Sequence, residues 1–100
     1  MNRAKDISYC EKFRVYGKLL TNLQADITEM YYMLDLSLSE IAEIKGVSRQ
    51  SVSCALRNIR AELDEMENVV GFIAKKKAIS DFALTLPEQE KTALTSILED

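Results

Sequence analysis

The sequence has no histidine or tryptophan, and only two cysteines, one proline and three glycines in 100 residues. Without histidine there is no Cys₂His₂ zinc finger, no imidazole general base and no Cys-His catalytic pair. Cys10 and Cys54 stand alone, without CxxC spacing, so we expect two small buried apolar groups and neither a metal nor a cofactor. Scarce proline and glycine among many helix formers favour helical structure.

Long apolar runs are also missing. No stretch approaches the roughly 18 residues that span a bilayer, and the start, MNRAKDIS, lacks the apolar core of a secretory signal. A hydrophobic content of 47% nevertheless indicates a globular chain. These features predict a cytoplasmic protein that does not bind membranes, folded as a single domain over residues 1–100 with one modest core.

Charge is segregated along the chain. The net charge of −3 gives no general attraction to nucleic acid, so binding requires a local cationic patch. Such a patch lies in residues 36–60, where Lys45, Arg49, Arg57 and Arg60 outnumber Glu40 and Glu43. The carboxylates that follow are spaced around a helix, so we interpret them as solvated surface and predict no enzyme: Glu62, Asp64, Glu65 and Glu67.

Residues 37–60, SLSEIAEIKGVSRQSVSCALRNIR, have the pattern of a helix-turn-helix. Ser37 and Glu40 are spaced for a capping box, which predicts the start of a helix. Gly46 predicts its end, because glycine enters the left-handed backbone region at least cost. Ser48 then caps a second helix, and the short turn lets the two helices cross steeply.

The second of these helices directs cationic and hydrogen-bonding side chains outward, with no carboxylate among them. Side chains of this kind at a helix start suit the DNA major groove and its flanking phosphates. We expect Arg49 and Gln50 to contact base edges or phosphates, and Arg57 to contact the DNA backbone. The full set of predicted DNA-binding residues is Ser48, Arg49, Gln50, Ser51, Ser53, Arg57, Asn58 and Arg60.

Helices are also predicted on both sides of this motif. Apolar residues at helical spacing predict helices over about residues 6–20 and 22–34, and Pro87 with Glu88 predicts a final helix over about residues 86–98. The expected fold is therefore an all-α domain of four to five helices.

The second helix of the motif has no stop signal at its end. Its apolar residues recur every three or four positions, which predicts a long extension to about residue 77. This apolar seam requires a cover, which could be the first helix, the C-terminal segment or a second copy; we favour a homodimer. The seam consists of Leu56, Ile59, Leu63, Met66, Val70 and Ile73.

Two clusters allow more than one interpretation. Tyr31 and Tyr32 could form an aromatic binding site, but we favour packing of Tyr31 and Leu34, with Tyr32 half exposed. Lys75–Lys77 suit the negative end of a helix dipole, and the alternative is a contact with phosphate or RNA.

Residues from about Phe13 to Lys77 resemble the YlxM family, small bacterial helix-turn-helix proteins encoded beside components of the signal recognition particle. More distantly, they resemble region 4 of sigma-70-type factors. Two departures are Lys45, where an aromatic residue is usual, and the stretch Ser53–Ala55. The matching segments are YGKLLT (16–21), YYMLDLSLSEIAE (31–43) and VSRQSV (47–52).

The resemblance implies an all-α fold and a role in the signal recognition particle pathway. Two functions remain open from the sequence. The first is a regulator that binds double-stranded DNA as a dimer. The alternative is a module that binds a protein or RNA of the particle and has no DNA operator.

Overall fold

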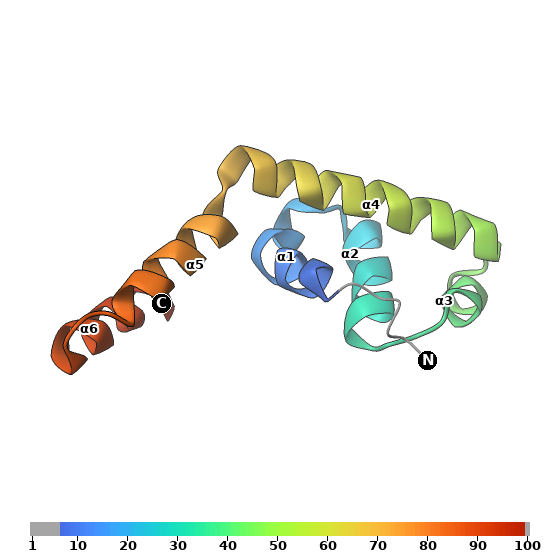
Figure 1. Cartoon of the computed structure of the whole chain (residues 1–100). Coiled ribbons are helices and arrows are strands. Elements are labelled where there is room, and N and C mark those ends of the chain that lie inside the picture. The colour runs from blue at the N-terminus through green and yellow to red at the C-terminus, as the bar shows by residue number, and fades with distance from the viewer. Residues whose placement is uncertain (1–6, 100) are drawn as a thin grey trace. The chain divides into compact units, whose positions relative to one another are not determined.

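The computed structural model describes residues 7–99 (Figure 1). In that range every regular element is a helix, so the all-α prediction is confirmed. The chain divides into two compact units, Met1–Val69 and Val70–Asp100, which we describe separately. The single domain over residues 1–100 stays a prediction, and the expected helix start at residue 6 lies outside the described residues.

Six α-helices make up most of the described chain, together with two short turns of 3₁₀ and π geometry. The predicted second helix is present as α2 followed by the π turn, and the predicted last helix as α6. The elements are α1 (Ser8–Tyr16), the 3₁₀ turn η1 (Gly17–Leu19), α2 (Asn22–Thr28), the π turn η2 (Glu29–Met33), α3 (Leu38–Lys45), α4 (Arg49–Val70), α5 (Phe72–Ala83) and α6 (Glu88–Glu99).

The core of the first unit is built on one stripe of α4. Val52, Leu56, Ile59 and Leu63 recur at intervals of four, three and four residues, and each is at most 1% exposed. Burial of such a side chain contributes about 1.5–3 kcal/mol. Figure 1 shows α4 running across α1, α2 and α3. The predicted seam is thus covered within the chain as far as Leu63.

The predicted extension of this helix to about residue 77 was wrong. Helix α4 ends at Val70, and Gly71 adopts a left-handed conformation with φ of 68° before α5 begins. Only glycine takes this left-handed conformation at little cost, and a residue in this conformation cannot continue a right-handed helix. Val70, the last residue of α4, is 58% exposed.

The turn between α3 and α4 follows the predicted pattern. Ser37 and Glu40 form a complete capping box at the start of α3, and Gly46 ends the helix at φ 68°. The N–H of Val47 donates to the carbonyl of Ala42 at 3.0 Å, and the N–H of Gly46 donates to that of Glu43. These two bonds form a Schellman motif, which satisfies the last carbonyls of α3.

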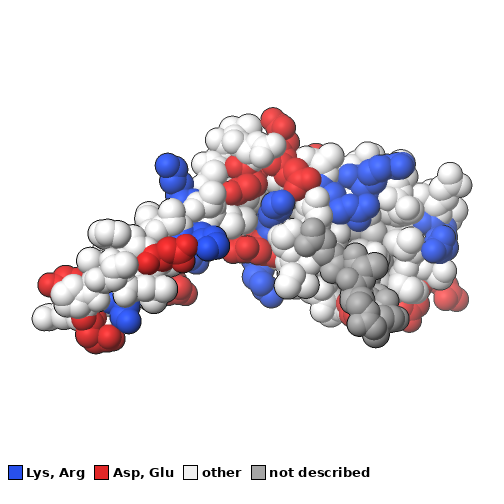
Figure 2. Space-filling view, viewed as in Figure 1, with Lys and Arg blue, Asp and Glu red and all other residues white. Residues whose placement is uncertain are grey.

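Charge changes sign along α4. Figure 2 shows Lys and Arg side chains over the N-terminal part of this helix and Asp and Glu side chains over its C-terminal part. The carboxylates of the C-terminal part were expected to be solvated. For Asp64 and Glu67 that expectation was wrong, since both are half-buried and hydrogen-bonded to α1.

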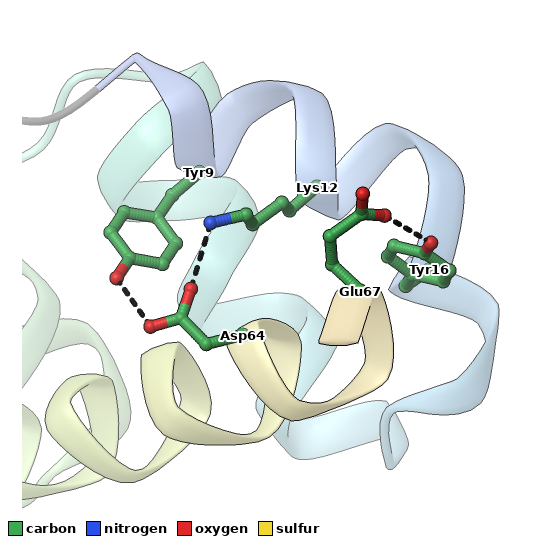
Figure 3. A network of polar contacts seen from close by, with 5 residues as sticks. All are labelled: Tyr9, Lys12, Tyr16, Asp64 and Glu67. Carbon is green, nitrogen blue, oxygen red and sulfur yellow. Dashed lines mark hydrogen bonds and ion pairs between the residues drawn. The ribbon is translucent and has the colours of Figure 1, made fainter. Parts of the chain in front are cut away.

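These two carboxylates hold α1 against α4, in a cluster that we call the α1–α4 latch: Tyr9, Lys12, Tyr16, Asp64 and Glu67 (Figure 3). Asp64 accepts from the Tyr9 hydroxyl and from the Lys12 ammonium, each at 2.8 Å. One turn along, Glu67 accepts from the Tyr16 hydroxyl at 2.5 Å. The latch fixes one end of α4 through charge-assisted bonds, which are stronger than neutral ones.

The latch shifts two pKa values in opposite directions. Burial raises the pKa of Asp64, but the hydrogen bonds from Lys12 and Tyr9 outweigh it and leave the pKa below its ordinary value. The hydrogen bond to Asp64 raises the pKa of Tyr9, and burial adds to the rise. The latch therefore requires an ionised Asp64 and a protonated Tyr9.

The two cysteines are less buried than expected. Cys54 is exposed on α4, so the prediction of a buried thiol was wrong there. Cys10 is half-buried, and its thiol lies 3.7 Å from the carbonyl oxygen of Tyr32. The prediction that Leu34 packs was also wrong, since it is 59% exposed.

We expect Gly46→Ala to lower the free energy of unfolding by about 1 kcal/mol, because a Cβ is disfavoured at φ 68°. No atom lies within 4 Å of the position that this Cβ would take, so the loss reflects backbone strain alone. Gly46→Asn is the matched control, since asparagine tolerates this conformation better. Urea unfolding followed by circular dichroism measures both, and equal losses would contradict the strain argument.

We expect Asp64→Asn to remove a pH dependence of stability at both ends of the scale. Because the pKa of Asp64 is lower in the folded state than in the unfolded state, this residue contributes its full share of stability above the unfolded pKa. That share is lost as the pH falls through the folded pKa. Because the pKa of Tyr9 is higher in the folded state, this residue contributes its full share of stability below the unfolded pKa. That share is lost as the pH rises through the folded pKa.

Urea unfolding from acid to alkaline pH, with the exposed Glu65→Gln as control, measures this effect. Near neutral pH, the loss in Asp64→Asn should be about 1 kcal/mol, since solvent screens this partly exposed pair. A pH profile of Asp64→Asn parallel to that of the wild type would show that the latch does not contribute.

Candidate nucleic-acid interface

The first turn of α4 is organised by Ser48. Its Oγ accepts a hydrogen bond from the N–H of Ser51 at 3.0 Å and donates one to the Ser51 hydroxyl at 2.9 Å. The predicted cap is therefore present. Two of the predicted DNA-binding residues already have this structural role, so their hydroxyls are less available to a ligand than the sequence suggested.

The outward face of α4 begins directly after this cap. The structure exposes most of the remaining predicted residues, with Gln50, Arg57 and Asn58 on the side of α4 away from the buried Val52 and Leu56. Among residues 7–99, no hydrogen bond or ion pair engages the side chains of Arg49, Gln50 or Arg57. We call this surface the α4 face, and it consists of Arg49, Gln50, Ser53, Arg57 and Asn58.

Arg60 differs from the other predicted residues. It is half-buried, and its guanidinium donates to the hydroxyl of Tyr32 at 3.3 Å. The Tyr32 ring makes an edge-on contact with Tyr31 at a centroid distance of 4.9 Å. Tyr32 thus has the half-exposed position that we favoured. Arg60 is held by its hydrogen bond to Tyr32 and is less available to DNA than Arg49 or Arg57.

Lys45, at the end of α3, is paired with Asp26 of α2 at 3.0 Å. The pair explains how a lysine is accommodated where an aromatic residue was expected, because the ammonium is neutralised at the surface while the stem covers neighbouring groups. It also removes one cation from the patch predicted over residues 36–60. The exposed positive charge of that patch consequently comes from Arg49 and Arg57.

An apolar groove of about 280 Å³, which was not predicted from the sequence, lies beside the turn. Two of its residues, Leu23 and Val47, are 60% and 48% exposed. The groove is lined by Leu23, Ile27, Lys45, Val47, Ser51, Val52 and Ala55.

The α4 face has the chemistry for binding an anionic polymer. Arg49 and Arg57, about two helical turns apart, provide positive charge. The amides of Gln50 and Asn58 provide both hydrogen-bond donors and acceptors. An arginine or glutamine projecting from the start of a helix can reach base edges in the major groove. The remaining ordered helices leave this face accessible within the first unit.

Comparison with known proteins supports the same motif. A family model described as "Putative helix-turn-helix protein, YlxM / p13 like", UPF0122, matches residues 3–99. The UPF0122 protein STH1464 of Symbiobacterium thermophilum is 46% identical over 63 residues, which cover 63% of this chain and 59% of the relative.

Two further relatives give similar values. The UPF0122 protein TTE1463 of Caldanaerobacter subterraneus is 47% identical over 60 residues, covering 60% of this chain and 51% of the relative. A UPF0122 protein of Clostridium kluyveri is 37% identical over 67 residues, covering 67% and 60%. The matched segments thus span 51–60% of these relatives' lengths. Because the family model matches nearly the whole sequence, the chain belongs to the UPF0122 family of YlxM / p13-like helix-turn-helix proteins.

Proposed function

We propose that the protein is a cytoplasmic regulator that binds double-stranded DNA as a homodimer, with the start of α4 in the major groove. The observation that carries the proposal is the exposed α4 face, whose arginines and amides have no partner among the described residues. The proposal gives the chain no catalytic role and no metal or cofactor.

The roles within the α4 face follow from position. Arg49 and Gln50 lie in the first turn of α4, where a recognition helix contacts base edges. Arg57 and Asn58 lie two turns further on and would contact the phosphate backbone. Ser53 lies between these pairs. Ser48 and Ser51 act through the helix cap, with the N–H groups of the first turn directed at a phosphate, and Arg60 would contribute at the edge of the surface.

The charge of the whole chain limits the strength of this binding. The net charge of −3 gives no long-range attraction to DNA, and the number of counterions released depends on how many phosphates the exposed cations contact. Two exposed arginines in each copy predict a shallow salt dependence. A dimer would double the number of contacts, which gives association a direct benefit for binding.

We expect Arg49→Ala and Arg57→Ala each to weaken binding to a mixed-sequence DNA duplex about tenfold at low salt. Loss of one phosphate contact should also reduce the slope of log affinity against log salt by about 0.9. Fluorescence anisotropy with a labelled duplex measures both quantities. Circular dichroism checks that each variant keeps its helices.

Arg14→Ala is the matched control, since Arg14 is an exposed cation on α1 and its removal changes the net charge equally. The proposal predicts that this variant binds like the wild type. Equal weakening by all three substitutions would show a nonspecific charge effect, and no weakening by Arg49→Ala or Arg57→Ala would show that the α4 face is not the DNA surface.

A second function is favoured by a different observation. Lys75 and Lys77 are exposed on α5, although Lys77 is paired with Asp81. The family resemblance implies a role in the signal recognition particle pathway. On this alternative, the protein binds the protein or RNA of that particle, and α5 carries the binding surface.

We expect particle RNA to be retained in a pull-down by the wild-type chain, if the alternative holds, and lost when Lys75, Lys76 and Lys77 are replaced by alanine. Arg49→Ala serves as the control, because it should leave that retention unchanged. Retention of neither the RNA nor the particle protein, with binding only to DNA, would exclude the alternative.

A further inference from the structure

Arg49 and Gln50 adjoin in the first turn of α4, but they point in different directions. At about 100° per residue, Gln50 lies about 150° from the middle of the buried stripe, whereas Arg49 lies about 50° from it. Arg49 is therefore exposed on a flank of the helix, and Gln50 faces away from the core. A groove lying over the outward side of α4 would meet Gln50 first. The buried stripe consists of Val52, Leu56, Ile59 and Leu63.

The surroundings leave the Gln50 amide accessible. Its side chain is exposed, and no hydrogen bond or ion pair engages it among residues 7–99. Ser53 and Cys54 flank it in the next turn, and both side chains are short and exposed. The first carboxylate of α4 is that of Glu62, about 18 Å further along the helix axis. A long, neutral amide thus projects beyond its immediate neighbours.

A primary amide matches one base edge of the major groove. It places an N–H donor and a C=O acceptor side by side. Adenine presents the complementary pair, the N7 acceptor beside the N6 amino donor, whereas guanine presents two acceptors, N7 and O6. Cytosine offers a donor, and thymine an acceptor with a methyl group. Only adenine can therefore form two hydrogen bonds with a single glutamine amide.

Asn58 carries the same amide group in a different position. It lies eight residues after Gln50, which is about 12 Å along the helix axis. Its side chain is also one methylene shorter, so the amide reaches less far from the helix. Asn58 is for this reason a contact for the phosphate backbone, and it provides an amide control on the same outward side of α4.

We propose that Gln50 reads an adenine in the major groove, while Arg49 contacts a phosphate beside it. The amide N–H of Gln50 donates to N7, and its carbonyl oxygen accepts from the N6 amino group. A pair of this kind discriminates against the other bases by at least about fivefold. The inference rests on the proposed DNA-binding function and deepens it, since it names the base that this helix selects.

Selection of bound duplexes from a random library, followed by sequencing, tests the base preference. We expect the wild type to enrich adenine at one position of the site, at least about fivefold over each other base. Gln50→Ala should lose this enrichment and still bind DNA. Gln50→Arg should shift the enrichment to guanine, which pairs with arginine through O6 and N7. Asn58→Ala and Arg49→Ala are the matched controls, and both should keep adenine at that position.

A base analogue tests the two atoms directly. Replacing the selected adenine by 7-deazaadenine removes the N7 acceptor and leaves the N6 amino group in place. Fluorescence anisotropy should show about fivefold weaker binding by the wild type, because one hydrogen bond is lost. Gln50→Ala should bind both duplexes equally, since its N7 contact is already missing. Equal weakening of the two proteins would show that another group contacts N7.

The remaining outcomes separate this inference from the proposed function. Adenine enrichment that survives in Gln50→Ala, or that disappears in Arg49→Ala or Asn58→Ala, would overturn the inference and leave DNA binding intact. Wild-type binding without any base preference would overturn it in the same way. A chain that binds no duplex even at low salt would refute the proposed function as well.

Discussion

The left-handed conformation of Gly46 is the constraint on which the first unit depends. A residue with right-handed helical backbone angles at this position would continue α3. The chain could then not turn into α4 within three residues. The Schellman bonds to Ala42 and Glu43 satisfy the carbonyls that this abrupt end exposes. Because the turn is so short, the outward direction of Arg49 is set by how α3 and α4 cross over the buried Ile41 and Val52.

Helix α4 has different tasks along its length. Its N-terminal turns present the α4 face to solvent, while its buried stripe forms the core. Its C-terminal turns are joined to α1 by the α1–α4 latch, where ionised Asp64 accepts two hydrogen bonds. A long helix held at one end and along one side is a rigid support, which suits a surface that must fit a groove. Rigidity of this kind reduces the entropy lost on binding.

Local signals made much of the fold predictable from the sequence. The capping box at Ser37 and the turn at Gly46 each depend on a few neighbouring residues, and both are present. The break at Gly71 was missed, because apolar residues continue at heptad spacing on both sides of this glycine and favoured an unbroken helix. The latch was missed for another reason: Asp64 meets α1 residues more than fifty positions away, and no spacing within the sequence reports such a contact.

The candidate site was predictable in its location and less so in its details. The outward face of α4 follows from helical periodicity, which places Gln50 and Arg57 away from the core. Arg49, seven residues before the buried Leu56, is exposed in the first turn of the helix. The hydrogen bond of Arg60 to Tyr32 could not be foreseen, because it joins two separate helices. Amide chemical-shift mapping on addition of a DNA duplex locates the binding surface directly. Binding through the α4 face will change the shifts of residues 47–58, whereas changes confined to α1 or α5 would exclude this face.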